Sequence, residues 1–162
     1  MEKAKVILRK ISAATAAKKS ERALGAGVTQ AYVHAGNTVA SVVVLSCETD
    51  FVARNEDFVK LARDVAMHIA ATAPKFVTRD DVQESDVAAA KAVFEEEAAS
   101  VPEKARAAAI QGKMDKYLQD FVLMEQPFIK QPEFTIRQLL EGATQKFGEN
   151  IAVTSFGRYS VK

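Results

Sequence analysis

The sequence predicts an α+β fold: a small three-stranded antiparallel sheet with flanking helices and a projecting helical hairpin, completed by dimerisation. The sequence contains three strand-like segments: the first two are joined by a short turn, and helical patterns separate the second from the third. This order lacks the regular strand–helix–strand alternation that favours a parallel sheet. A sheet of three strands has two open edges, which natural proteins usually cover or pair. We therefore expect two copies of the chain to associate.

The first predicted element is a basic helix over residues 2–20. Its alanines favour helix, and Val6, Ile7, Leu8 and Ile11 give it a narrow apolar stripe. This stripe is too thin to bury a domain on its own. The segment is therefore typical of a docking arm, or of the last helix of a further domain.

A β-hairpin is predicted next. Residues 28–34 and 38–46 are rich in β-branched side chains, and Gly36 and Asn37 between them suit a tight turn. The second strand is almost continuously apolar, so we expect both of its faces to be covered.

A helix is predicted over residues 55–72. Asn55 can cap its start, and the carboxylates of Glu56 and Asp57 complement the helix dipole in the first turn. The expected buried face consists of apolar residues at helical spacing: Phe58, Leu61, Ala62, Val65 and Ile69.

A helical hairpin is expected at about 85–124, with arms over residues 85–99 and 102–124. Ser100 and Glu103 match a capping box at the start of the second arm.

The closing segment begins where residues 126–128 break the helix. Thr135 and Gln138 match another capping box, and Gly148 suits the position after the end of that helix. A last strand is predicted over residues 151–161.

The composition indicates an ordinary soluble globular protein, with 48% hydrophobic and 27% charged residues. A net charge of +1 gives no overall attraction to nucleic acid or anionic membrane, and no apolar run is long enough to span a membrane. Because lysines and arginines crowd the N-terminal segment, nucleic-acid binding through residues 3–22 stays open as an alternative. The single cysteine, Cys47, indicates a reducing compartment.

Residue patterns that carry catalysis are scarce. His34 and His68 lie on different elements without metal-ligand spacing, and no phosphate-binding glycine loop is present. A nucleophilic Cys47 paired with a histidine is conceivable, but a small buried cysteine is the commoner case. We therefore expect no metal, no cofactor and no enzymatic chemistry.

The junction from Cys47 to Asn55 joins a buried strand to a capped helix. Large aromatic side chains are usually buried, so spacing alone favours a local role in which Phe51 folds into the core and Asp50 caps the helix. The alternative is that this turn presents an aromatic ring and a carboxylate to a partner. His68, predicted at the flank of the helix, leaves the same choice open.

Several motifs resemble the elongation factor Ts family. The nine residues from Cys47 to Asn55 read C-E-T-D-F-V-A-R-N, followed by E-D-F, and they are similar to the family signature. Further matches follow in the expected order over about residues 18–162: residues 66–71 with 74–76, residues 126–130 and residues 148–151.

The resemblance implies a guanine-nucleotide exchange factor that binds elongation factor Tu. In the family, the turn corresponding to Thr49, Asp50, Phe51 and Val52 enters the GTPase domain and helps to dislodge Mg²⁺, with the phenylalanine as a wedge. The remaining implied contacts with elongation factor Tu are those of Arg54, Asn55, Met67 and His68. The family needs no cofactor and implies no direct contact with nucleic acid or membrane.

The chain departs from the family pattern in two ways. Family members begin with a three-helix domain, of which residues 1–24 match only a remnant and its linker, before a dimerisation and core domain over residues 25–162. Longer members also carry two core repeats in one chain, whereas this chain has one and resembles the short members that form homodimers. Some short members reinforce the dimer with a cysteine in the last strand; this strand has none, so the resemblance implies a noncovalent dimer. Bacterial cytoplasm is the implied location, with an organelle as the lesser possibility.

Overall fold

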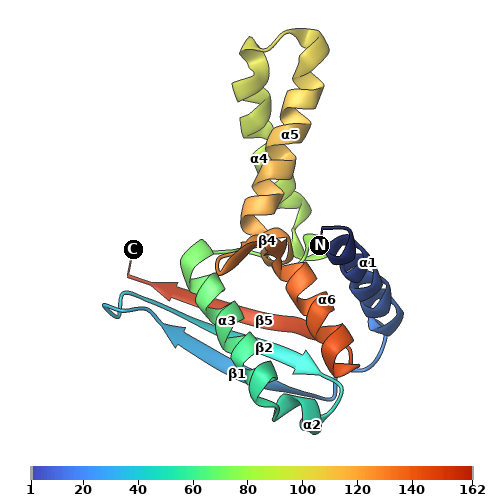
Figure 1. Ribbon diagram of the computed structural model, residues 1–162. Coiled ribbons are helices and arrows are strands. Elements are labelled where there is room, and N and C mark those ends of the chain that lie inside the picture. Colours follow the sequence, from blue (N-terminus) through green and yellow to red (C-terminus); the bar gives the residue numbers. More distant parts are fainter. Residues whose placement is uncertain (1, 162) are drawn as a thin grey trace. The chain divides into compact units, whose positions relative to one another are not determined.

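A computed structural model describes residues 2–161. It has helices and strands in the α+β arrangement predicted from the sequence (Figure 1). The chain forms two compact units. One consists of the residues up to Ala73 together with those from Pro127 onward, and the other runs from Pro74 to Gln126.

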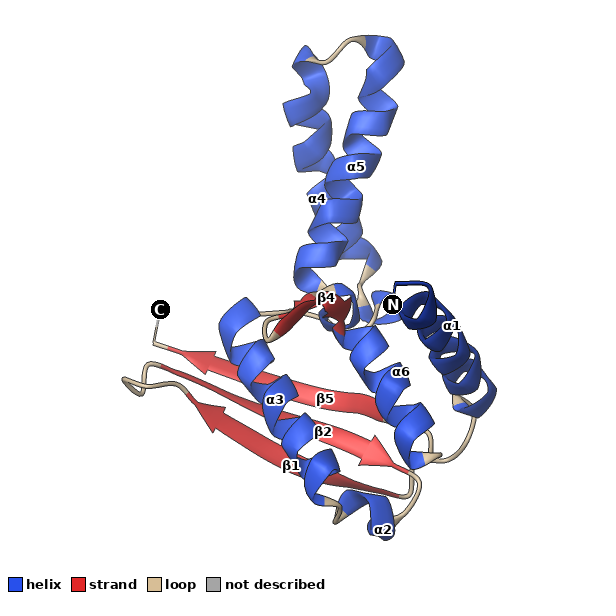
Figure 2. Ribbon diagram, viewed as in Figure 1, coloured by secondary structure: helices blue, strands red, loops and turns tan. Residues whose placement is uncertain are grey.

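The first unit is built on a three-stranded antiparallel sheet in the order β1-β2-β5 (Figure 2). The strands are β1 (Ala26–Val33), β2 (Val39–Cys47) and β5 (Ala152–Ser160). Gly36 and Asn37 adopt positive φ angles of 97° and 58° in the turn between β1 and β2. Glycine and asparagine tolerate this left-handed conformation, which matches the twist of a β-hairpin. The predicted sheet and its hairpin turn are confirmed.

Helices cover one face of this sheet. They are α1 (Glu2–Lys19), α2 (Asp50–Ala53), α3 (Glu56–Thr72) and α6 (Ile136–Phe147). Figure 1 shows α3 and α6 lying across the sheet, with α1 beside α6. The hydroxyl of Ser41 donates a 2.5 Å hydrogen bond to the carbonyl of Ala66, which fixes the side of β2 that faces α3. The core lies between this face and the helices.

The expectation that both faces of β2 are covered is wrong for the single chain. Val43 and Leu45 are fully buried beneath α3, whereas Val42 is 36% exposed on the opposite face. Side chains alternate between the two faces of a strand, and within residues 2–161 the helices of this unit lie on one face only.

Two of the predicted helix caps are confirmed in this unit. The side chain of Asn55 accepts a 2.9 Å hydrogen bond from the backbone N–H of Asp57 and so caps α3. Thr135 and Gln138 form the reciprocal capping box of α6. Gly148, at φ 76°, ends α6 in the left-handed conformation that favours glycine.

The second unit contains the predicted helical hairpin. Its elements are the 3₁₀ turns η1 (Arg79–Asp81), η2 (Ala98–Ser100) and η3 (Leu123–Glu125), and the helices α4 (Glu84–Glu97) and α5 (Glu103–Phe121). Phe94 and Tyr117 meet edge to face across the two helices, with ring centroids 6.2 Å apart. The capping box predicted from Ser100 is wrong, because Ser100 lies within η2 and α5 begins directly after Pro102, where no side chain caps it.

A small two-stranded sheet escaped prediction. It pairs β3 (Pro127–Phe128) with β4 (Gln131–Thr135). The sequence predicted only a helix break here, since a two-residue strand that begins with proline has no alternating pattern to detect.

Candidate functional site

The junction after β2 contains a short helix rather than a simple turn. Thr49 takes extended angles at the start of α2, and Asp50, Phe51, Val52 and Ala53 form its single turn. Val52 and Ala53 are 4% and 9% exposed, whereas Phe51 is 84% exposed. Successive residues of a helix point about 100° apart, so burying Val52 and Ala53 turns Phe51 outward. The interpretation in which Phe51 folds into the core is therefore wrong.

Phe51 is the most exposed large hydrophobic side chain among the residues for which the structure gives exposure. With Asp50, Arg54 and Asn55 it lines a shallow depression at the surface. All four were predicted as site residues, and the structure brings them together. Thr49 is exposed at the start of the same helix, and Val52 anchors it from below. We call Thr49 to Val52 the tip segment.

Backbone hydrogen bonds hold the tip segment against the start of α3. The N–H groups of Ala53 and Arg54 donate to the carbonyls of Thr49 and Asp50, each over 3.1 Å. The N–H of Asn55 donates to the carbonyl of Val52 at 3.0 Å, and the carbonyl of Asn55 accepts from α3. These hydrogen bonds on both sides of Phe51 order the backbone that carries its exposed ring.

His68 lies in the interior of the first unit. Its side chain is fully buried, and its Nδ1 atom accepts a 3.4 Å hydrogen bond from the backbone N–H of Ile129. The ring of Phe128 lies 6.0 Å away, centroid to centroid. The sequence predicted His68 at the flank of the apolar face of this helix and left its burial open. The structure buries it there, because Phe128 and Ile129 cover that flank of α3.

Met67 belongs to a different part of the surface from Phe51. It is half-buried and lines a pocket formed by residues of α3, the β-hairpin, β5 and the β3–β4 connection: Tyr32, His34, Val39, Ala70, Ala71, Ile129 and Arg158. His68 is 12 positions beyond Glu56 in the numbering of α3, or roughly 18 Å along the axis. The structure therefore does not bring Met67 and His68 together with the tip segment.

Cys47 is buried directly beneath the tip segment. Its thiol donates a 3.3 Å hydrogen bond to the carbonyl of Thr49. Burial raises the pKa of the Cys47 thiol, and the negative charges of Glu149 and Asp50 raise it further. A raised thiol pKa lowers the fraction of thiolate, which is the nucleophilic form.

Cys47 is therefore expected to react slowly with a thiol reagent such as DTNB. At pH 8 the folded chain should react about tenfold more slowly than the chain unfolded in urea, because the buried thiol must first be exposed by local opening. The absorbance change of the reagent gives both rates. Faster reaction in the folded chain would instead identify Cys47 as an activated nucleophile.

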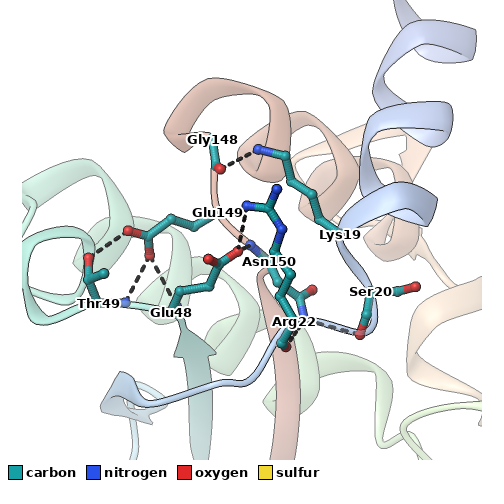
Figure 3. A network of polar contacts seen from close by, with 8 residues as sticks. All are labelled: Lys19, Ser20, Arg22, Glu48, Thr49, Gly148, Glu149 and Asn150. Carbon is teal, nitrogen blue, oxygen red and sulfur yellow. Dashed lines mark hydrogen bonds and ion pairs between the residues drawn. The ribbon is translucent and has the colours of Figure 1, made fainter.

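Glu149 is the residue of this site that the sequence did not identify. It accepts hydrogen bonds from the backbone N–H groups of Glu48 and Thr49, each over 3.0 Å (Figure 3). The motif at residues 148–151 was recognised as similar to the family, but nothing in the spacing indicates a contact across about 100 residues.

Neither a metal site nor a membrane span is found in the described part of the chain. No group of three or more histidine, cysteine, aspartate or glutamate residues within 2–161 could hold a metal ion. Over the same residues, no helix is long and apolar enough to cross a membrane.

Comparison with known proteins identifies the family. Residues 2–162 match the sequence model described as Elongation factor TS, so the similarity includes α1. Elongation factor Ts of Heliobacterium modesticaldum is 39% identical over 99% of this chain and 76% of its own length. The proteins of the same name from Carboxydothermus hydrogenoformans and Koribacter versatilis are 41% and 42% identical over 99% of this chain, which covers 75% and 74% of their lengths. The chain therefore belongs to the elongation factor Ts family, and it is a translation elongation factor.

Proposed function

We propose that this chain is a guanine-nucleotide exchange factor that binds elongation factor Tu in its GDP form and promotes the release of GDP. The observation that carries this proposal is the 84% exposed ring of Phe51 on a short helix whose next two residues, Val52 and Ala53, are buried. Aromatic side chains dominate the energetics of protein interfaces when they enter a pocket of the partner. The ring is available in the free chain for that role.

The proposed mechanism needs no covalent chemistry. Mg²⁺ requires near-ideal octahedral oxygen ligands and bridges the phosphates of the nucleotide, so a small displacement of its ligands weakens GDP binding. The tip segment is inserted into the GTPase domain, where Phe51 acts as a wedge and the Asp50 carboxylate lies beside it. By linkage, a factor that binds only the distorted state weakens GDP as much as GDP weakens the factor.

Arg54 and Asn55 extend the proposed contact surface around Phe51. Both are exposed and line the same depression. Met67 and His68 form a separate proposed contact at the other end of α3. For His68, contact with elongation factor Tu requires Phe128 and Ile129 to move, because these residues lie against its ring and Nδ1 atom.

A nucleotide-chase experiment tests the proposal. Elongation factor Tu is loaded with fluorescent GDP and mixed with excess unlabelled GDP, with or without the chain, and complex formation is followed separately by gel filtration. Faster loss of fluorescence in the presence of the chain is the expected result. Complex formation with an unchanged GDP release rate would instead identify a binding protein without exchange activity.

We further propose that two copies of the chain form a noncovalent homodimer through the uncovered face of the sheet. The strand register aligns Val33 with Ala40 and Ala40 with Tyr159 across three strands. Val33 and Tyr159 are 58% and 69% exposed, and Val42 is 36% exposed on the same face. A second copy would cover this apolar face with an identical one, as two-fold symmetric dimers do.

Introducing a charge at this face is expected to disrupt the dimer. The wild-type chain should sediment at twice its 17.6 kDa mass, and Val42→Asp should shift it to the monomer, because the carboxylate would be buried without a partner. Ala35→Asp places the same charge in the exposed β1–β2 turn and serves as the matched control. A wild-type chain that sediments as a monomer at every concentration would contradict the proposed dimer.

We also propose that residues 1–24 act as an arm attached to a core over residues 25–162, and that the protein works in the bacterial cytoplasm. The named relatives are bacterial proteins. We propose that the chain does not bind nucleic acid or membranes directly.

A further inference from the structure

The Glu149 carboxylate reaches the tip segment from the other end of the chain. Glu149 lies between α6 and β5, and its Oε2 atom accepts hydrogen bonds from the backbone N–H groups of Glu48 and Thr49, each over 3.0 Å. Its Oε1 atom accepts a third hydrogen bond, of 2.5 Å, from the hydroxyl of Thr49. Figure 3 shows the carboxylate lying against both residues. A charged acceptor makes these bonds stronger than neutral ones.

These contacts settle the conformation of Thr49, the residue from which α2 begins. Its hydroxyl does not cap α2 but turns toward Glu149. Its carbonyl accepts from the thiol of Cys47 and from the N–H of Ala53. The N–H, the carbonyl and the hydroxyl of Thr49 are thus all held, and the direction in which α2 leaves β2 is fixed with them.

Glu149 is held in turn by a reciprocal contact. Its neighbour Asn150 donates its backbone N–H to the Glu48 carboxylate at 2.6 Å, so each segment accepts from the backbone of the other. Arg22 pairs with the same Glu48 carboxylate at 3.5 Å. The side-chain amide of Asn150 donates to the carbonyls of Ser20 and Arg22 at 3.2 and 3.0 Å. Lys19 donates to the carbonyl of Gly148.

The network therefore joins three segments beside Thr49: the end of β2, the α6–β5 junction and the linker after α1 (Figure 3). Of the charged side chains in this network, that of Glu149 contacts the tip segment itself, where it accepts hydrogen bonds from the N–H and the hydroxyl of Thr49. Glu149 is only partly buried, and Thr49 is exposed. Removing the Glu149 carboxylate should consequently loosen the tip segment without opening the core.

We propose that Glu149 is a positioning residue for nucleotide exchange: its carboxylate fixes Thr49, and through Thr49 it orders the helix that presents Phe51 to the partner. This inference rests on the proposed exchange function. An ordered tip segment binds with less loss of conformational freedom than a mobile one, so the contribution of Glu149 lies in affinity for elongation factor Tu. The rate of GDP release from the formed complex depends instead on Phe51 and Asp50.

Hydrogen exchange in the free chain tests the positioning directly. In Glu149→Ala the backbone N–H groups of Glu48 and Thr49 should exchange about tenfold faster than in the wild type, as measured by NMR, because they lose their acceptor. Amides of β2 such as those of Val43 and Leu45 should be unchanged. Glu149→Gln retains one acceptor oxygen and should restore part of the protection.

The functional consequence is read from a titration of GDP release. For Glu149→Ala, the concentration of chain that gives half of the maximal release rate should rise by about fivefold to tenfold, while the maximal rate stays within about twofold. Glu149→Gln should fall between Glu149→Ala and the wild type. Glu141→Gln, which alters a half-buried carboxylate on α6 beside Arg137, is the matched control and should leave both values unchanged.

The two measurements separate failure of this inference from failure of the proposed function. Unchanged exchange of the Glu48 and Thr49 amides in Glu149→Ala would overturn the inference, and so would lost protection with an unchanged half-maximal concentration. A wild-type chain that does not speed GDP release would overturn the proposed function. The amide rates would then still decide whether Glu149 holds the tip segment.

Discussion

Phe51→Ala should remove most of the exchange activity and leave the fold intact. The side chain is 84% exposed, so its loss should change the free energy of unfolding by no more than about 0.5 kcal/mol. A buried aromatic anchor of an interface is worth about 2 kcal/mol or more, which corresponds to roughly a 30-fold loss. The GDP release rate at a fixed, subsaturating concentration of chain measures that loss, and a urea titration measures the stability.

Arg54→Ala is the matched control for Phe51→Ala. Arg54 is exposed and lines the same depression, so its truncation also removes surface near α2 but no aromatic ring. Its effect on GDP release should be several-fold smaller. If Phe51→Ala promoted GDP release as well as the wild type does, the wedge would have to be assigned to another residue.

Phe58→Ala should have the largest effect on stability. Phe58 is fully buried on α3, and its ring meets that of Phe147 on α6 edge to face, with centroids 5.9 Å apart. Truncating a buried phenylalanine to alanine costs about 3–5 kcal/mol, because apolar contacts are lost and a cavity remains. Small domains are stable by only about 5–15 kcal/mol, so much of the folding free energy would be lost.

The two phenylalanine variants form a pair in which the same substitution tests opposite surroundings. Urea-induced unfolding followed by circular dichroism should give a much lower midpoint for Phe58→Ala than for Phe51→Ala. At low temperature, the Phe58→Ala molecules that remain folded should still promote GDP release. A destabilisation of Phe58→Ala below about 1 kcal/mol would contradict the packing between α3 and α6.

Local sequence signals predicted much of the fold because their physical causes are also local. The glycine and asparagine of the β1–β2 turn supply the positive φ angles that the hairpin requires. Asn55 and Thr135 cap their helices through hydrogen bonds to residues two and three positions along the chain. In each case the interacting groups lie within a few residues of one another, so a short stretch of sequence contains both partners and predicts their contact.

Features that depend on distant segments could not be predicted in the same way. The flank of α3 at His68 is covered by Phe128 and Ile129, which are about 60 residues further along the chain. Phe51 is directed outward because Val52 and Ala53 take the inward positions of a one-turn helix that no periodicity reveals. The capping box at Ser100 had the right residue types, but η2 occupies the position where α5 was expected to begin.

The tip segment combines both kinds of information. Its residue pattern resembles the family signature, and the comparison with elongation factor Ts proteins confirms the family. Spacing alone favoured a buried Phe51, whereas the structure leaves the ring 84% exposed. Thr49, the residue that precedes the helix, is held by Cys47 and Glu149. Residue spacing therefore favoured the wrong orientation of the ring, whereas the family resemblance implied the exposed one that the structure has.

The rate of GDP release from elongation factor Tu, measured against the concentration of the chain at fixed Mg²⁺, tests the proposed exchange function most directly. The rate should rise and then saturate, and the acceleration should shrink when Mg²⁺ has been chelated beforehand, because the ion to be displaced is already gone. A release rate that stays at its basal value, at concentrations where the complex with elongation factor Tu has formed, would contradict the proposed function.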